Sequence, residues 1–119
     1  METLNVSIED CAEHPSCHII HFQGEFDGYA KENIADVQNL VDTSNDGAML
    51  IFDFEKLNYM NSYAIGHLIS WRNSLSQSGG HLFIAGTTPT VQDALDAVGS
   101  NVLFTFYPDV DTAVQQITR

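Results

Sequence analysis

Apolar and polar positions follow two different periods along the second half of the chain. Residues 48–54 (AMLIFDF) and 81–85 (HLFIA) are short, nearly unbroken apolar runs, as expected of strands that are covered on both faces. After each run, apolar residues recur at intervals of three and four, which is the spacing of an amphipathic helix. This alternation predicts right-handed crossovers and a largely parallel sheet with helices on both faces.

Four helices are expected, the first over residues 28–42. The residues that mark the helix ends are Asn45, Asp46 and Gly47 after the first; Asn61 (N-cap) and the Gly79–Gly80 pair around the second; Thr88 (N-cap) and Pro89 at the start of the third; and Asp109 (N-cap) before the fourth. The four apolar faces contain Ile34, Val37, Leu40 and Val41; Ile65, Leu68, Ile69 and Leu75, interrupted by Arg72; Val91, Ala94, Leu95 and Val98; and Val110, Ala113, Val114 and Ile117.

Three further strands complete the pattern. Residues 4–8 alternate apolar and polar side chains, which is the period of a half-buried strand. Residues 17–22 (CHIIHF) are apolar and β-branched in the middle, so we expect a second strand that ends at Gly24 and pairs antiparallel with the first. A short last strand is expected over residues 103–106.

Chain length and composition fit a single domain over residues 1–119. With 44% hydrophobic and 17% charged residues, the composition is that of an ordinary globular protein, and 119 residues suffice for one core but not for two. We therefore expect one α/β domain in which a mixed sheet of about four to five strands is covered by about four helices.

The chain is strongly acidic, with 16 Asp and Glu residues against four Lys and Arg and a formal net charge of -12. Nucleic acids and anionic membranes attract clustered basic residues, whereas Lys31, Lys56, Arg72 and Arg119 are scattered along the chain. We therefore expect neither partner. The acidity fits either a basic protein surface or a need for solubility.

Nothing in the sequence indicates export or membrane insertion. No apolar run approaches the about 20 residues that cross a bilayer, and residues 1–10 lack the basic start and apolar centre of a signal peptide. The protein is therefore expected in the cytoplasm, with Cys11 and Cys17 both reduced.

Residues that often carry catalysis or bind metals form no recognisable set. His18 and His21 are three apart on a predicted strand and so point to opposite faces, while His67 and His81 lack ligand partners at zinc-site spacing. Phosphate-binding glycine loops and a nucleophile elbow are absent from the sequence. We therefore expect no metal, no cofactor and no enzymatic activity.

Two carboxylates, Glu25 and Asp27, lie close together after the second predicted strand. Such a pair performs acid–base catalysis in some enzymes. Alternatively, Asp27 caps the first helix and Glu25 is solvated. Both residues are also candidate contacts of a partner protein.

The most informative segment leads from the strand at residues 48–54 through a short polar loop into the second helix, whose first residue is Ser62. We expect its hydroxyl to be exposed. A helix N-terminus carries unpaired N–H groups and a partial positive charge, so a phosphate is stabilised there. Met60, Tyr63 and His67 are expected to extend a docking face beside this serine.

This segment resembles the STAS-domain family of anti-sigma factor antagonists. Residues 53–55 (DFE) and 57–66 (LNYMNSYAIG) resemble the family's strand ending in Asp-Leu-Ser and its Val-x-Phe-(Ile/Met)-Asp-Ser-Ser-Gly-Leu-Gly motif. Further similarity lies in residues 24–27 (GEFD, family Gly-Glu-Leu-Asp), 79–86 (GGHLFIAG, family Gly-Gly-x-Leu-x-Leu-x-Gly) with Pro89, and 103–108. The resemblance thus covers nearly the whole chain and implies a STAS-like fold.

The resemblance also implies a function. In that family a serine kinase that is also the anti-sigma factor phosphorylates the first serine of the motif, and the unphosphorylated form binds that kinase and frees the sigma factor. By position this serine is Ser62. Asn61 replaces the usual aspartate, and Tyr63-Ala64 replaces Ser-Gly. Asparagine still caps a helix, whereas the bulk of Tyr63 alters the docking face.

The leading hypothesis is a partner-switching regulator, a monomer or weak dimer, that binds an anti-sigma factor/serine kinase-like protein. Its partner-binding residues are expected to be Met60, Asn61, Ser62, Tyr63, His67, Glu25 and Asp27. An alternative is an unphosphorylated accessory or assembly subunit, for example of a transport ATPase. A more distant alternative is an enzyme or nucleotide-binding protein that uses Glu25, Asp27 and Ser62.

Overall fold

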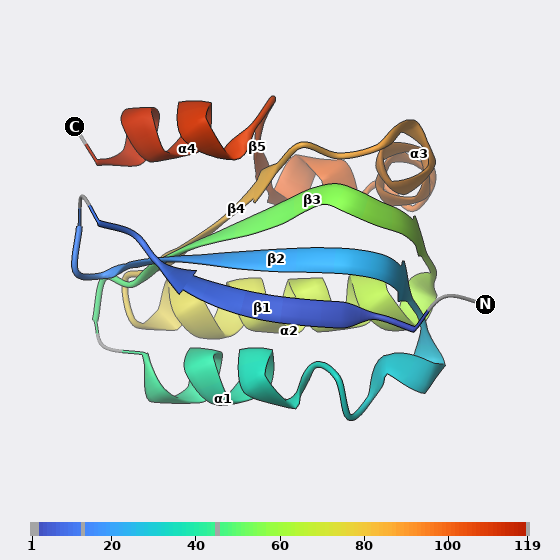
Figure 1. Ribbon diagram of the computed structural model, residues 1–119, viewed down its shortest axis with the longest axis horizontal. Coiled ribbons are helices and arrows are strands. Elements are labelled where there is room, and N and C mark those ends of the chain that lie inside the picture. The colour runs from blue at the N-terminus through green and yellow to red at the C-terminus, as the bar shows by residue number, and fades with distance from the viewer. Residues whose placement is uncertain (1–2, 13, 45, 119) are drawn as a thin grey trace.

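The sheet expected from the apolar runs forms the centre of the molecule. The structure is a computed structural model and describes residues 3–12, 14–44 and 46–118. The strands are β1 (Asn5–Asp10), β2 (Cys17–Phe26), β3 (Met49–Met60), β4 (His81–Ala85) and β5 (Thr105–Tyr107). They lie in sequence order, with β1 antiparallel to β2 and the other neighbours parallel (Figure 1). The α/β class and the mixed sheet with an antiparallel edge are therefore confirmed.

Helices cover the two faces of this sheet unequally. They are α1 (Ala35–Thr43), α2 (Ser62–Gln77), α3 (Pro89–Ala97) and α4 (Val110–Ile117), with short 3-10 turns η1 (Gly28–Ala30) and η2 (Ser100–Leu103). The apolar sides of α1, α2 and α3 share one large buried cluster with the sheet. On the opposite face, α4 packs with Ile51 and Ala85 in a smaller cluster. Since Ser7, Gln23 and Glu55 are exposed, helices cover that second face only in part.

An aromatic cluster at the centre of the larger core joins α2 to β2 and β3. The fully buried Trp71 lies edge-on to Phe52, with 5.7 Å between the ring centroids, and 6.2 Å from Phe26. Its indole N–H donates a hydrogen bond of 2.7 Å to the side-chain oxygen of Gln38 on α1. The polar atom of this large side chain is thus satisfied, and its rings pack the helix onto the sheet.

The inward face of α2 is turned slightly from the predicted one. Ile65 and Leu68 are buried as predicted, but Ile69 is only half-buried, and Trp71 points inward beside them. Arg72 lies at the rim, where its Nε–H donates to the carbonyl of Leu103 at 2.9 Å. The indole has the largest apolar area on the helix, so its burial sets the rotation of α2.

Three strands are longer than predicted, and the first of them, β1, reaches Asp10 instead of ending at Ile8. β2 continues past Gly24 to Phe26, and β3 continues past Phe54 to Met60. The polar residues after Phe54 made this stretch resemble a loop, but Leu57 is buried, and the extension of β2 supplies backbone partners across two register shifts. The second helix therefore follows directly from the end of a strand.

Several helix and strand ends also differ from the prediction. The segment 28–42 begins as the turn η1, and the regular helix α1 starts later. Val98 lies just beyond α3 and is 62% exposed, so it is not part of the buried helix face. Gly99, with a φ of 72°, leads into η2, which delays the last strand to Thr105. Asn45 lies outside the described residues.

Gly24 is the position where the fold depends most directly on a glycine. Its φ is +105°, and a Cβ atom there would lie 2.5 Å from the carbonyl oxygen of Thr3. We expect Gly24→Ala to lower the free energy of unfolding by roughly 1–3 kcal/mol, because both the backbone and Thr3 must shift. Urea denaturation measures this loss. Gly28→Ala is the control, since a Cβ there meets nothing within 4 Å, and equal stability of the two variants would contradict the prediction.

Candidate functional site

The predicted N-cap of α2 is present. Asn61 has an extended backbone, with φ -124° and ψ -171°. Its side-chain oxygen accepts hydrogen bonds from the backbone N–H groups of Tyr63, at 3.1 Å, and Ala64, at 3.4 Å. Two of the four N–H groups that a helix start leaves unpaired are thereby satisfied. The asparagine thus turns the chain sharply from β3 into α2.

Ser62, the first residue of α2, is exposed as predicted. The inward positions of the helix are Ala64, Ile65 and Leu68, which are all buried, so the serine lies away from the core. α2 contains 16 residues, and its aligned peptide dipoles place a partial positive charge at this end. The hydroxyl therefore stands in solvent at a position that favours negative charge.

Met60 is buried, so the exposure expected for its side chain is wrong. As the last residue of β3 it pairs with Phe26 of β2, and its side chain is only 3% exposed within the main core. The physical reason is the strand extension described above. Leu57 and Met60 are both buried although they are three positions apart, because a register shift between them turns Met60 inward, whereas a loop would have left its side chain free to project.

Tyr63 and His67 form a half-buried aromatic pair beside the serine. Their rings meet edge-on with 4.7 Å between centroids, and His67 lies 5.4 Å from Trp71 in the core. Tyr63 also packs partly against the main cluster, so its side chain contributes to both surface and core. Burial lowers the pKa of His67 below its ordinary value, and the imidazole is therefore neutral at pH 7.

The two candidate carboxylates, at the end of β2, lie at the same end of the sheet as Ser62, because the ends of β2 and β3 are neighbours. Asp27 caps the turn η1, where its side chain accepts a hydrogen bond of 2.9 Å from the N–H of Tyr29. Asp27 is thus a capping residue, but of η1, whereas α1 starts later with Ile34 at its N-cap position and no side-chain cap. Glu25 is half-buried on β2, opposite Tyr59 of β3.

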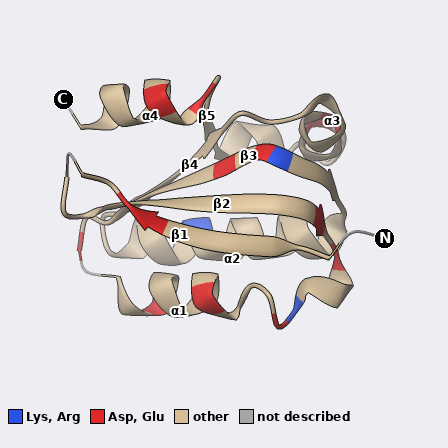
Figure 2. Cartoon of the chain, viewed as in Figure 1, with Lys and Arg blue, Asp and Glu red and all other residues tan. Residues whose placement is uncertain are grey.

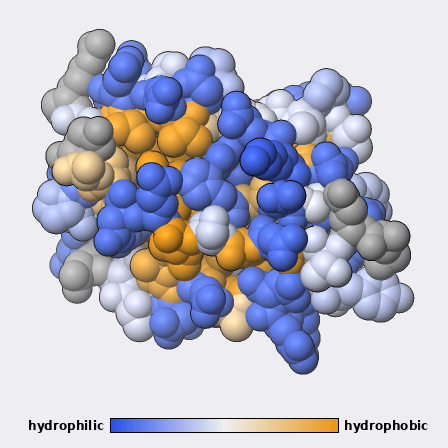
Figure 3. Space-filling model, in the orientation of Figure 1, coloured by the Kyte–Doolittle hydropathy of each residue, from blue (hydrophilic) through white to orange (hydrophobic). Residues whose placement is uncertain are grey.

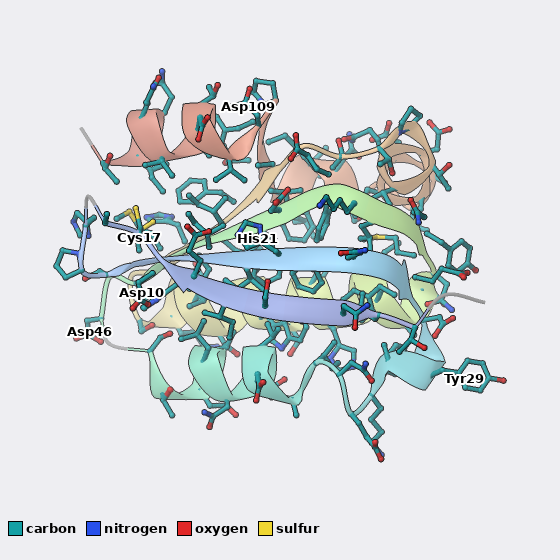
Figure 4. The ribbon with its side chains drawn as sticks, in the orientation of Figure 1. Asp10, Cys17, His21, Tyr29, Asp46 and Asp109 are labelled. Atoms are coloured by element: carbon teal, nitrogen blue, oxygen red, sulfur yellow. The ribbon has the colours of Figure 1, made fainter. Side chains whose placement is uncertain are left out.

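Sequence reasoning missed two exposed tyrosines at this end. Tyr29 is 83% exposed and projects from the turn after β2 (Figure 4), and Tyr59 is 41% exposed on β3. No local signal marked Tyr59, because the part of β3 that buries Met60 and leaves Tyr59 exposed was not predicted as a strand. Amphipathic rings of this kind are common in protein interfaces.

An apolar hollow of about 420 Å³ adjoins the serine. Its walls come from α2 and from the segment between α3 and β5, and they include Ser62, Ile65, Ile69, Val98, Val102 and Leu103. Val102 is 81% exposed, so the hollow is open to solvent. The start of α2 therefore combines an exposed hydroxyl with exposed apolar surface, the composition expected of a protein-binding site.

Metal binding receives no support from side-chain positions. His18 and His21 pair with different carboxylates, His18 with Asp10 and His21 with Glu9 and Asp53. Among residues 3–12, 14–44 and 46–118, no three His, Cys, Asp or Glu side chains are placed to hold a metal ion.

Within the same residues, no helix has the length and apolar character needed to span a membrane.

Comparison with known proteins agrees with this arrangement. A family model described as "STAS domain" matches residues 10–113. No curated protein is similar enough in sequence to count as a match.

Solved structures with a similar fold include two bacterial proteins of related description. An anti-sigma factor antagonist from Mycobacterium paratuberculosis has 17% sequence identity and a TM-score of 0.79, over 98% of this chain and 96% of that one. A STAS domain protein from Planctomyces limnophilus, described as an anti-sigma-factor antagonist, has 11% identity and a TM-score of 0.84, over 97% and 99%.

A sulfate transporter family protein from Wolinella succinogenes is also similar in structure. It has 14% identity and a TM-score of 0.71, over 85% of this chain and 84% of that one. At such low identities these similarities show the fold alone. The fold thus occurs both in proteins described as antagonists and in one of a transporter family.

The cap at Asn61 should contribute measurably to stability. We expect Asn61→Ala to lower the free energy of unfolding by about 0.5–2 kcal/mol, because the N–H groups of Tyr63 and Ala64 lose their acceptor. Asn61→Asp should preserve or slightly raise stability, since a carboxylate caps equally well and favours the positive helix end. Thermal unfolding of the three proteins tests this, and an Asp variant as unstable as the Ala variant would argue against capping.

The burial of His67 predicts a titration below its ordinary pKa of 6.5. Because the folded pKa is lowered, the neutral ring's contribution to stability is complete above pH 6.5 and declines as the pH falls through the folded pKa. NMR of the ring protons should show a midpoint below 6.5. His67→Phe should remove this share of the acid sensitivity, and a midpoint at or above 6.5 would rule the interpretation out.

Proposed function

The chain belongs to the STAS domain family, and from that membership we propose that it is a regulatory protein of the anti-sigma factor antagonist type. In this proposal the unmodified chain binds an anti-sigma factor that is also a serine kinase, and phosphorylation of Ser62 ends the binding. The observation that carries the proposal is the exposed position of Ser62 at the first residue of α2, at the motif position of the family's phosphorylated serine.

The local geometry supports Ser62 as a phosphate acceptor. Its side chain is exposed, and a phosphate there lies at the positive end of a helix. The helix dipole favours such an anion by about 0.3–1 kcal/mol, so phosphorylation should leave the domain folded. A switch at this position therefore changes the surface and not the fold.

The substitutions within the family motif are compatible with this role. Asn61 caps α2 through the same two hydrogen bonds that a carboxylate would accept. The ring of Tyr63 packs edge-on against His67, and Ser62 remains exposed beside it. Access to the hydroxyl is thus retained although Tyr63 is larger than the residue it replaces.

We propose that the docking surface is centred on Ser62, Tyr63 and His67 and extends into the apolar hollow between α2 and η2. Glu25 and Asp27, at the neighbouring end of β2, add negative charge at its edge. Because the chain carries a net charge of -12, this surface suits a partner with basic residues around an apolar contact. Met60 is left out, since its side chain is buried.

Charge at Ser62 should act on association far more than on folding. A partner that accepts a neutral hydroxyl must desolvate a dianion after phosphorylation, which costs several kcal/mol if the phosphate is buried unpaired. We therefore expect Ser62→Asp to weaken binding of the native partner by at least about 100-fold, while Ser62→Ala keeps it. Calorimetric titration with the partner captured by the Ser62→Ala protein measures both effects.

The matched control is Ser70→Asp, which places the same charge on the exposed side of the same helix, two turns further along. This variant should bind normally. If Ser62→Asp also binds as tightly as the unmodified protein, in low and in physiological salt, the switch is disproved and a constitutive accessory or assembly subunit takes its place. Mass spectrometry after incubation with the partner and ATP then shows directly whether Ser62 gains a phosphate.

A further inference from the structure

His21 joins three strands on the sheet face opposite α1 and α2. Its Nδ1 lies 2.6 Å from a carboxylate oxygen of Asp53 on β3, and its Nε2 lies 2.7 Å from one of Glu9 on β1. The histidine itself belongs to β2, between these two strands. Figure 4 shows it near the middle of the sheet. One imidazole ring therefore links the edge strand to the central strand.

These contacts match a protonated ring. An ionised carboxylate accepts hydrogen bonds and donates none, so each contact needs an N–H group on the imidazole. The neutral ring has one N–H group, and its second nitrogen would turn a lone pair toward a carboxylate at hydrogen-bonding distance. The imidazolium form has two N–H groups and satisfies both Glu9 and Asp53.

The surroundings favour that charge overall. Burial opposes it, but the hydrogen bonds to Glu9 and Asp53 and their negative charges outweigh burial, so the pKa of His21 is raised above its ordinary value of 6.5. Figure 2 shows further acidic residues on β1, β3 and α4. The other charged or titratable groups that share hollows with His21 are Asp10 and Cys11 from the first strand and its end, Glu55 and Lys56 from β3, and Asp109 and Asp111 at α4. Carboxylates thus outnumber the one lysine in this set.

The bridge matters most for β1, the antiparallel edge of the sheet. Five of its six residues are exposed, so β1 itself contributes little buried area. Backbone pairing with β2 holds β1 in the sheet. The side chain of Glu9 adds a contact to His21, and His21 in turn contacts Asp53 of β3. In the space-filling view this face carries hydrophilic residues with hydrophobic residues visible between them (Figure 3). A partly hydrated polar link of this kind responds to the pH of the solvent.

We propose that the Glu9–His21–Asp53 bridge is a pH-sensitive clasp, which fastens β1 to the centre of the sheet while His21 is protonated and loosens it when His21 loses its proton. The sign follows from the raised pKa of the folded state. The stabilisation is complete below pH 6.5, the ordinary value, and is lost as the pH rises through the folded pKa. β1 is therefore held less strongly at pH values above the folded pKa of His21.

The test combines ring NMR with amide hydrogen exchange of the whole chain between pH 5.5 and 9, a range of about three to four units that spans the titration of histidine. His21 should titrate above 6.5. Protection factors of the β1 amides should fall across this titration, by about tenfold for each unit by which its midpoint exceeds 6.5. His21→Gln should abolish the fall. His18→Gln is the matched control, because His18 also pairs with a β1 carboxylate, that of Asp10, and this variant should keep the fall.

A second variant keeps the proposal testable if His21→Gln folds poorly. Glu9→Gln changes a side chain that is 60% exposed and removes one of the two carboxylate charges that contact the His21 ring. It should lower the midpoint of the His21 titration and reduce the loss of β1 protection at high pH. A midpoint of His21 at or below 6.5 in the unmodified protein, or the same fall of β1 protection in Glu9→Gln, would overturn the clasp.

Discussion

The burial of Trp71 against Phe26 and Phe52 is the contact on which the candidate site depends. It fixes the rotation of α2, because the indole is the largest apolar group on that helix and lies fully inside the core. With this face inward, the helix turns its serines outward, at Ser62 and again at Ser70. The position of the exposed hydroxyl is thus a consequence of core packing several turns away.

Strand β3 supplies the second constraint, because α2 begins directly where β3 ends. The extended strand keeps Met60 inside, and the cap at Asn61 then reverses the chain within a single residue. This abrupt junction places Ser62 at the surface while its neighbours on both sides are anchored. A rigid support of this kind suits a site whose charge changes, because added charge alters what the surface binds without altering the fold.

The two faces of the sheet differ in what they contribute. The face under α1 and α2 carries the aromatic core and supplies most of the buried apolar area. The other face, only partly covered by α4, carries polar side chains that pair with one another, as His21 does with Glu9 and Asp53. On the first face the half-buried His67 loses stabilisation as the pH falls, whereas on the second face the proposed His21 bridge loses it as the pH rises. Phosphorylation at Ser62 and protonation at His21 would therefore act on separate parts of the domain.

The sequence alone determined those features that depend on neighbours along the chain. The α/β class, the antiparallel edge, the bounds of β4 and the cap at Asn61 followed from local periodicity and capping chemistry, which a short segment contains by itself. Exposure of Ser62 followed from the same local reasoning.

Other features were decided only by tertiary structure. Met60 became a buried residue because β2 lengthens to pair with β3, and the polar residues before it gave no local sign of this pairing. The bridge at His21 joins residues 12 and 32 positions away in the chain, and one open sheet face resulted from where α4 packs. Such contacts depend on strand register and on the packing of distant segments, and the hydrophobic period of a single segment specifies neither.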